Sequence, residues 1–398
     1  YNDGVRISTN SWGAAVGGAY NSDAQRYDAL VRDSQPTGST FPVAGNQENV
    51  ILFAAGNRGS GANTTGSPAT GKNVITVGAA ENVHPHGEAD GCGVPDTGAD
   101  SANDIIDFSS RGPCDDGRVK PEIMAPGTHV TGGVFQANAV ATGNGVAAGC
   151  FNAGGVCALG SGNFFPVGQQ FYTTSSGTSH STPAVAGAAA LIRQRFINGG
   201  LAPASPAMTK AILMNSARYM TGVGANDNLF SNNQGMGEVN LTQFFDIQLG
   251  TVGTTPTIVR DQVGAEMFTA SGQMRTYTGT VNNNTKPFRV VLAWTDPPGP
   301  TSGNAFINNL DLEVTVGGNT YKGNVFTGAN SATGGTADIR NNSESVFVPA
   351  GVSGNFIVTV KATNIAGDGV PGVGGALDQD FALVVYNADQ AAVAVIGS

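Results

Sequence analysis

Residues 174–187 read Thr-Ser-Ser-Gly-Thr-Ser-His-Ser-Thr-Pro-Ala-Val-Ala-Gly, a tight turn of small residues that leads directly into a helix. Small and apolar residues predict that this helix runs from Ala184 to Phe196, and Gly199-Gly200 ends it. Pro183 suits the first turn of a helix, where its missing N–H costs nothing. Ser179 therefore lies where the turn becomes the helix, beside unpaired backbone N–H groups and the positive end of the helix dipole.

Strands and further helices alternate around this segment. Residues 49–55 form one continuous apolar run, which is typical of a strand in a parallel sheet that is covered on both faces. The other elements that we expect are strands over residues 5–12 and 73–79, a helix over 22–34 with a capping box of Ser22 and Gln25, and a helix that begins at Ser205-Pro206. This alternation predicts an α/β domain with a parallel sheet and helices on both of its faces.

Five short motifs occur in an order that resembles the subtilisin-like serine proteases, the subtilases of peptidase family S8. They are Ser11-Trp12-Gly13, Ala54-Ala55-Gly56-Asn57, Phe108-Ser109-Ser110-Arg111-Gly112-Pro113, Ala125-Pro126-Gly127 and Gly177-Thr178-Ser179. The resemblance covers residues 5–239 and implies a partial subtilisin-like fold there. The family usually has a methionine after the serine. This chain has His180, whose position next to Ser179 on a helix turns its ring away from the serine hydroxyl.

The resemblance implies a role for each motif at the site. Ser179 would be the nucleophile of acyl transfer, and the side-chain amide of Asn57 would hold the oxyanion together with the backbone N–H of Ser179. The substrate backbone would pair with Ser11-Trp12-Gly13 by strand addition and lie against Ala54-Ala55-Gly56. From the residues alone, Asn57 can also be a turn asparagine and Ser11-Trp12-Gly13 an ordinary strand end.

The resemblance also requires a general base and a carboxylate that orients it. The family carries them in D-[ST]-G and H-G-T-H motifs upstream of the S-W-G strand, and this chain has neither motif there. His84, His86-Gly87 and Asp96-Thr97-Gly98 resemble fragments of these motifs, but they follow Asn57 and stand in the reverse order. We expect residues 84–98 to be a surface loop and His129 to be structural. Two explanations stay open: the base and carboxylate belong to an N-terminal portion that was cut off or is a separate chain, or this chain is a gene fragment without activity. In both cases this chain alone is expected to be nearly inactive.

Two other functions fit parts of the sequence. A non-catalytic protein that binds carbohydrate or a cell surface through a C-terminal barrel has no need of a base, but it has no use for Ser179 and Asn57 either. An esterase of the α/β-hydrolase type is disfavoured because G-x-S-x-G is absent around Ser179. We therefore expect a serine endopeptidase with protein and peptide substrates.

The pattern changes after about residue 248 to short alternating strands separated by turns. We expect residues 1–248 to form the catalytic domain, without the family's N-terminal portion, and residues 249–398 to form an all-β sandwich of the jelly-roll type. Residues 294–297 (Trp-Thr-Asp-Pro) and 308–312 (Asn-Asn-Leu-Asp-Leu) resemble the C-terminal barrel of the large, oxidatively stable alkaline subtilases.

Barrels of this kind in the family bind calcium, so the resemblance implies a structural calcium ion here. Calcium takes six to eight hard oxygen ligands. The side chains that offer them are Asn309, Asp311, Asp338, Asn341, Asn342 and Glu344. No loop has the spacing of an EF-hand, and turn-forming asparagine and aspartate explain the same pattern without an ion.

The four cysteines point to an oxidising compartment. The spacing of Cys92, Cys114, Cys150 and Cys157 fits no zinc motif. We expect two local disulfides, Cys92–Cys114 and Cys150–Cys157, in a secreted protein, with four buried free thiols as the alternative.

The overall charge argues against two kinds of partner. The formal net charge is −10 and the sequence pI is about 4.7, so nucleic acid and anionic membranes are not expected as partners. No apolar run approaches the roughly 20 residues of a membrane-spanning helix.

Overall fold

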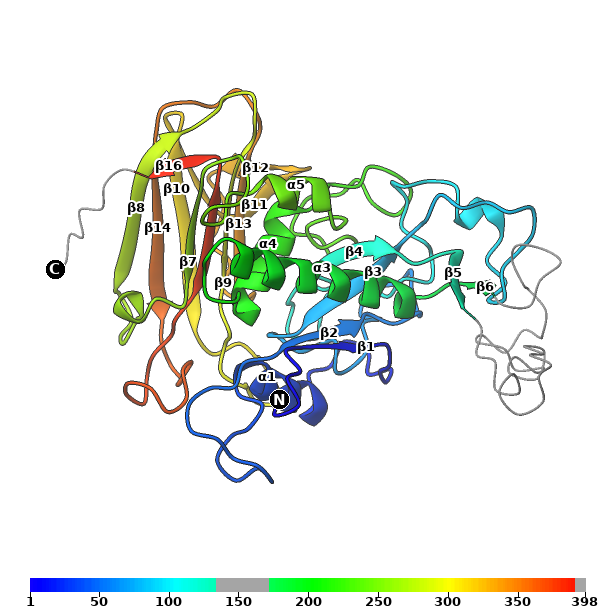
Figure 1. Cartoon of the computed structure of the whole chain (residues 1–398), viewed down its shortest axis with the longest axis horizontal. Coiled ribbons are helices and arrows are strands. Elements are labelled where there is room, and N and C mark those ends of the chain that lie inside the picture. Colours follow the sequence, from blue (N-terminus) through cyan, green and yellow to red (C-terminus); the bar gives the residue numbers. More distant parts are fainter. Residues whose placement is uncertain (134–171, 391–398) are drawn as a thin grey trace.

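The computed structural model describes residues 1–133 and 172–390 (Figure 1). The first half of the chain contains a four-stranded parallel sheet. Its strands are β1 (Ile7–Asn10), β2 (Val50–Ala54), β3 (Ile75–Ala80) and β4 (Ile123–Pro126), hydrogen-bonded in that order. Among the described residues β1 pairs with β2 alone, so it is an edge strand of this sheet.

Helices cover both faces of the parallel sheet. The helices of this half are α1 (Ser22–Arg32), α3 (Thr178–Asn198), α4 (Pro206–Ser216) and α5 (Leu241–Asp246). Val50 and Leu52 of β2 pack in the core that contains α3, whereas Ile51 and Phe53 pack with residues of α1. Because successive side chains of a strand point to opposite faces, this division confirms the predicted sheet with helices on both faces.

The predicted start of one helix is confirmed, and those of two others differ from the structure. Ser205 caps α4 as predicted, because its hydroxyl accepts a hydrogen bond from Met208 N. The predicted capping box of α1 is wrong: Asn21 is the cap, with Oδ1 accepting from the N–H groups of residues 23 and 24. The helix at Ser179 begins at Thr178, so Pro183 lies inside α3 and not in its first turn.

The second half is a sandwich of two antiparallel sheets, beginning at Thr257. The larger sheet has the order β12-β11-β10-β14-β8-β16 and the smaller one β13-β9-β15-β7. The strands are β7 (Thr257–Asp261), β8 (Met274–Val281), β9 (Phe288–Ala293), β10 (Asn309–Val316), β11 (Asn319–Thr327), β12 (Asn330–Thr333), β13 (Ser343–Val348), β14 (Asn355–Asn364), β15 (Ala382–Tyr386) and β16 (Ala388–Gln390). The expected boundary after residue 248 falls between α5 and β7.

The smaller sheet is buried on both faces, which joins the two halves of the chain. In β9, Val290 and Leu292 pack against the larger sheet, whereas Val291 and Ala293 belong to the core that contains α3 and α4. A buried ion pair adds to this junction: Lys72 Nζ, just before β3, lies 2.5 Å from Asp296 Oδ2, just after β9. Figure 1 shows the sandwich (yellow to red) packed beside the helices (green) that cover the parallel sheet.

A hairpin of two short strands precedes the helix that carries Ser179. β5 (Val130–Gly133) and β6 (Tyr172–Ser175) are antiparallel and lie at the end of the molecule opposite the sandwich (Figure 1). β6 ends at Ser175, four residues before Ser179, so its position determines how the turn enters α3.

The predicted disulfide between Cys92 and Cys114 is wrong. Cys92 is in a disulfide, but Cys114 is a free and buried thiol. The two sulfurs contact different segments: Cys92 Sγ lies 3.3 Å from the backbone N and O of Ser176, whereas Cys114 Sγ lies 4.0 Å from the carbonyl of Thr70. The other predicted pair, Cys150–Cys157, lies outside the described residues. In the described parts of the chain, no helix combines the length and apolarity needed to cross a membrane.

Candidate active site

A hollow of about 220 Å³ lies at the carboxyl ends of β1 and β2. Open parallel sheets usually bind their ligands at this end. Its lining includes every substrate-binding and catalytic residue expected from the sequence, namely Ser11, Trp12, Gly13, Ala54, Ala55, Gly56, Asn57 and Ser179. The structure therefore gathers motifs that are up to 168 residues apart in the chain around one concave surface.

Ser179 occupies the second position of α3 and is half-buried. The N–H of a residue in this position has no carbonyl partner within its own helix and is available to a ligand. The Ser179 carbonyl also has no partner within the helix, because the residue four positions later is Pro183, which has no N–H to donate. The hydroxyl of Ser11 donates a hydrogen bond of 2.9 Å to this carbonyl instead, which ties the edge strand to the start of the helix.

The side chain of Asn57 is held in one orientation. Its Oδ1 accepts two hydrogen bonds from Thr178, one from the backbone N–H at 2.9 Å and one from the hydroxyl at 2.8 Å. Because a backbone N–H can only donate, the oxygen of the amide is the atom that faces Thr178. The Nδ2 donor of Asn57 therefore points away from Thr178 and toward Gly177.

Gly177 shows that the two expected oxyanion donors converge. The backbone here has φ of 153°, and a Cβ built on this residue would meet Asn57 Nδ2 at 3.2 Å and Ser179 N at 3.7 Å. Both nitrogens thus lie within 4 Å of a single point, close enough together to donate to the same substrate carbonyl oxygen. A side chain at position 177 would crowd Asn57.

The edge beside the hollow presents backbone and an aromatic side chain. Residues 11–13 follow β1 directly, and Trp12 is 52% exposed although its ring packs edge-on against Phe53 at 5.3 Å. Among the described residues β1 has no strand neighbour on its other side. Residues 11–13 also line the hollow.

None of the four histidines contacts Ser179. His180 turns its Nε2 to the hydroxyl of Ser175, 2.6 Å away, and burial lowers the pKa of its imidazole. His84, His86 and His129 contact one another and the segments around residues 94 and 174. The chain has four histidines in all, and each of them lies in the described residues, so no histidine of this chain is placed to act as the base of Ser179.

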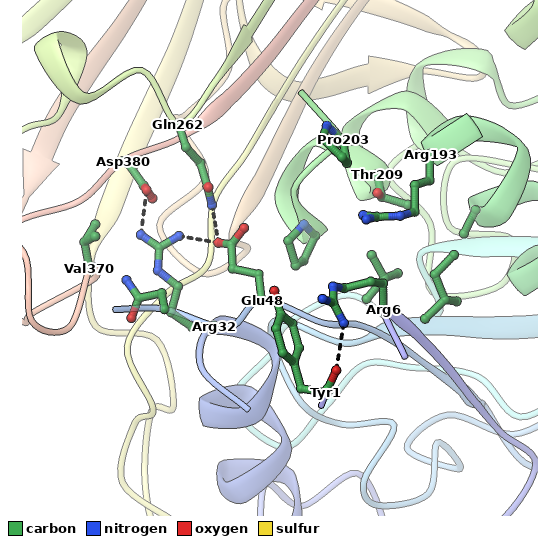
Figure 2. Close-up of a pocket in the computed structure, with 16 residues that line it drawn as sticks. Tyr1, Arg6, Arg32, Glu48, Arg193, Pro203, Thr209, Gln262, Val370 and Asp380 are labelled. Atoms are coloured by element: carbon green, nitrogen blue, oxygen red, sulfur yellow. Dashed lines mark hydrogen bonds and ion pairs between the residues drawn. The ribbon is translucent and has the colours of Figure 1, made fainter. Parts of the chain in front are cut away.

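A larger cavity of about 360 Å³ lies at the opposite, amino ends of β1 and β2, next to the sandwich (Figure 2). Three of its charged side chains, Arg32, Glu48 and Asp380, are linked by ion pairs. Arg32 lies 2.8 Å from Glu48 and 2.5 Å from Asp380, and Arg6 donates to the carbonyl of Tyr1. Burial raises the pKa of Glu48 to about 7. Ser179 and Asn57 line the smaller hollow and not this cavity, so the smaller hollow is the candidate active site.

The residues expected to bind calcium lie on or near β10 and β13, but the carboxylates of Asp311, Asp338 and Glu344 are not among the clustered metal-ligand groups of the described residues, and most of the oxygens accept hydrogen bonds. The Asp338 carboxylate accepts from the side-chain amides of Asn324 and Asn341, and Asp311 accepts from Asn309 Nδ2 and Thr363. Asn341 Oδ1 accepts from Val119 N, and Asn342 donates to Trp294 O. Two buried oxygens, Asn309 Oδ1 and Glu344 Oε1, have no hydrogen-bond partner.

Two residues with a role at the hollow were not singled out from the sequence. Thr178 orients Asn57, and its hydroxyl also accepts from Gly56 N at 3.3 Å. Gly177 leaves space for the amide of Asn57. Both belong to the Gly177-Thr178-Ser179 motif, so their proximity to the serine was the available signal, but the partner strand that gives them their role is about 120 residues away.

Comparison with known proteins decides the family. The family model described as the subtilase family, Peptidase_S8, matches residues 1–237, which is more than half of the chain. The chain belongs to the subtilase family. This membership confirms the resemblance drawn from the five motifs, together with the mixed fold of a parallel subtilase sheet and a β-rich second part.

Individual relatives of this subtilase share a modest part of their length with it. It is 24% identical to the serine protease/ABC transporter B family protein tagD of Dictyostelium discoideum, over 79% of this chain and 21% of that protein. It is 32% identical to the serine protease AprX of Bacillus subtilis (strain 168), over 44% of this chain and 32% of AprX. Among solved structures, sphericase is 24% identical, with a TM-score of 0.34, over 60% of this chain and 57% of sphericase. The chain thus spans a third or less of the length of these curated relatives.

Proposed function

We propose that this subtilase is a serine endopeptidase that cleaves peptide bonds through an acyl-enzyme on Ser179. The observation that carries the proposal is the convergence of Asn57 Nδ2 and Ser179 N on one point beside the hollow. Protein and peptide substrates follow from the edge at residues 11–13, which can pair with an extended backbone.

Each residue of the hollow would have a distinct task. Ser179 Oγ would attack the substrate carbonyl carbon, and the two N–H donors would stabilise the negative charge that develops on the carbonyl oxygen. Thr178 would keep the Asn57 amide aimed at that oxygen. Ser11-Trp12-Gly13 on one side and Ala54-Ala55-Gly56 on the other would hold the substrate backbone.

The described residues of the site do not include a general base for Ser179. A serine without a base retains only the roughly 10³–10⁴-fold acceleration that comes from the oxyanion donors and substrate binding. We propose that the base and its orienting carboxylate reach Ser179 from another polypeptide segment, such as a cleaved N-terminal fragment of the same protein. By this proposal the present chain alone is nearly inactive.

Peptide hydrolysis with and without a complementing segment tests the proposal. The chain alone, and its Ser179→Ala variant, should hydrolyse a casein substrate at the same low rate. Addition or co-expression of a subtilase segment that carries the D-[ST]-G and H-G-T-H motifs should produce turnover that Ser179→Ala abolishes. Full turnover by the isolated chain, or complemented turnover that survives Ser179→Ala, would contradict it.

Secretion and calcium binding belong to the same proposal. The disulfide at Cys92 supports an oxidising, extracellular location. The resemblance to the calcium-binding barrels of the family supports a structural calcium ion held among Asn309, Asp311, Asp338, Asn341 and Glu344, of which Asn309 Oδ1 and Glu344 Oε1 are buried without a hydrogen-bond partner. If calcium binds there, it should raise the melting temperature of the chain and Glu344→Gln should remove that rise, whereas equal melting temperatures in calcium and in EDTA would count against the ion.

The alternative role expected from the sequence, binding of carbohydrate or a cell surface through the sandwich, needs an independent test. A glycan-binding screen of the whole chain and of its Ser179→Ala variant addresses it directly. The protease proposal predicts no saturable glycan binding.

A further inference from the structure

The hollow that contains Ser179 carries a single charge. Among the described residues that line it, Arg58 is the one ionisable residue. The rest of the lining consists of glycine, alanine, serine and threonine together with Asn57 and Trp12, none of which is charged. Arg58 directly follows Asn57 and is exposed. Because a guanidinium stays protonated in proteins, the wall of the hollow bears one permanent positive charge.

The positive charge of Arg58 has no partner of opposite sign. Within the described residues, the guanidinium of Arg58 forms no ion pair with a carboxylate. By contrast, the side chains of Arg32, Arg118 and Arg218 each form an ion pair. The charge of Arg58 is therefore available to a ligand that enters the hollow.

The backbone around Arg58 is anchored to the neighbouring segment that contains Phe108 and Ser110. The N–H of Arg58 donates a hydrogen bond of 3.1 Å to Ser110 Oγ, and the N–H of Gly59 donates one of 2.7 Å to the carbonyl of Phe108. A Cβ built on Gly59 would meet two backbone oxygens of this segment at 2.2 and 2.4 Å, so the chain packs closely against it. These contacts fix the point from which the Arg58 side chain leaves the backbone.

The position of Arg58 beside Asn57 indicates which residue of a substrate it meets. In the proposed reaction, Asn57 Nδ2 and Ser179 N donate to the carbonyl oxygen of the bond that is cleaved. This oxygen belongs to the substrate residue on the amino side of that bond. Since Arg58 is the next residue after Asn57, the side chain of this substrate residue is the one that Arg58 can reach.

We propose that Arg58 determines specificity and that the hollow prefers a peptide with glutamate or aspartate on the amino side of the cleaved bond. A carboxylate accepts two parallel N–H bonds from a guanidinium, a geometry that suits the planar fork of its N–H groups. A lysine side chain in the same place would be repelled by the like charge. The formal net charge of the chain is −10, so the molecule as a whole does not attract an acidic peptide, and the preference depends on Arg58 itself.

Peptide binding to the Ser179→Ala chain tests the preference without any turnover. The probes are acetyl-Ala-Ala-Ala-Xaa-amide peptides with glutamate, glutamine or lysine as Xaa, and the fluorescence of Trp12, which lines the hollow, reports binding. The glutamate peptide should bind about threefold more tightly than the glutamine peptide and about tenfold more tightly than the lysine peptide. In 1 M salt, where the Debye length falls to about 3 Å, these differences should shrink.

Variants at position 58 assign the preference to the arginine. Arg58→Gln should remove the difference between the glutamate and glutamine peptides, and Arg58→Glu should make the lysine peptide the tightest of the three. Arg340→Gln removes an exposed arginine just before β13, in the sandwich, and should leave all three affinities unchanged. Circular dichroism of each variant checks that its fold is intact, and the exposure of Arg58 makes it suitable for substitution.

This inference rests on the proposed function only in that the ligand is a peptide, so the two can fail separately. Failure of every complementing segment to produce turnover would contradict the proposed function and leave the binding comparison intact. The specificity of Arg58 would be overturned by equal affinities of the three peptides or by a glutamate preference that survives Arg58→Gln. Absence of saturable binding of all three peptides at millimolar concentration would overturn it as well.

Discussion

The hydroxyl of Ser11 donates a 2.9 Å hydrogen bond to the carbonyl of Ser179. This bond connects the end of the edge strand, where a substrate would pair, to the helix turn that carries the nucleophile. The Ser179 carbonyl is free to accept this bond because Pro183, four residues later in the helix, has no N–H to donate to it. The contact between the substrate edge and the serine therefore depends on Ser11 and Pro183, which are 172 positions apart in the sequence.

A double-mutant cycle tests this connection. Ser11→Ala should lower the free energy of unfolding by about 0.5–1.5 kcal/mol, the usual net value of one hydrogen bond. Pro183→Ala supplies an N–H to the same carbonyl, so Ser11→Ala should cost less in that background. Chemical denaturation of the four chains measures the coupling, with Ser8→Ala on β1 as a control. Additive effects would show that the two residues do not serve the same carbonyl.

The orientation of Asn57 depends on Thr178. Thr178→Val keeps the shape of the side chain but removes the hydroxyl bonded to Asn57 Oδ1, so the complemented enzyme should lose about 10-fold in kcat. Thr178→Ser keeps the hydroxyl and should retain most of the activity. Rates of peptide hydrolysis measure both effects, and equal rates for the valine and serine variants would separate Thr178 from catalysis.

The sequence predicted the parallel sheet, α3 and the members of the hollow because these features depend on local periodicity and on contiguous motifs. It misplaced the cap of α1 because asparagine and serine are similarly good caps, and Asn21 and Ser22 are adjacent. It mispaired Cys92 because sequence distance does not reveal that Cys114 turns into the interior beside Thr70. Lys72 and Asp296 are 224 residues apart in the sequence, so no local sequence pattern could predict their ion pair.

That ion pair gives a prediction for stability. Lys72→Met leaves the buried carboxylate of Asp296 without its cation and should lower the free energy of unfolding by about 3–5 kcal/mol. Lys72→Met with Asp296→Asn should be less destabilised than Lys72→Met alone, because the neutral amide removes the unpaired buried charge and its one oxygen can still accept from one of the two N–H groups, Ile307 N or Asn308 N, that the carboxylate serves. Urea denaturation measures both; a double variant less stable than the single one would contradict the charge argument.

Glu48 should make stability depend on pH. Burial raises its pKa from 4.5 to about 7, so the folded protein keeps a proton that the unfolded chain releases between these values. Stability should therefore fall as pH rises from about 4.5 to 7, by up to about 3 kcal/mol from this group. Asp261, with a pKa of about 6 in the folded protein, adds a fall of the same sign. Glu48→Gln should flatten the profile from pH 4.5 to 7, while Glu313→Gln, at an exposed position on β10, should not.

The most direct test of the account concerns the two donors that converge beside Ser179. In the complemented enzyme, Asn57→Ala should lower kcat for a peptide substrate by about 10²–10³ and leave KM nearly unchanged, because the donor acts on the charge of the transition state. Asn198→Ala, at the exposed end of α3, should change neither constant. An unchanged kcat in Asn57→Ala would contradict the central claim that Asn57 and Ser179 N form the oxyanion site.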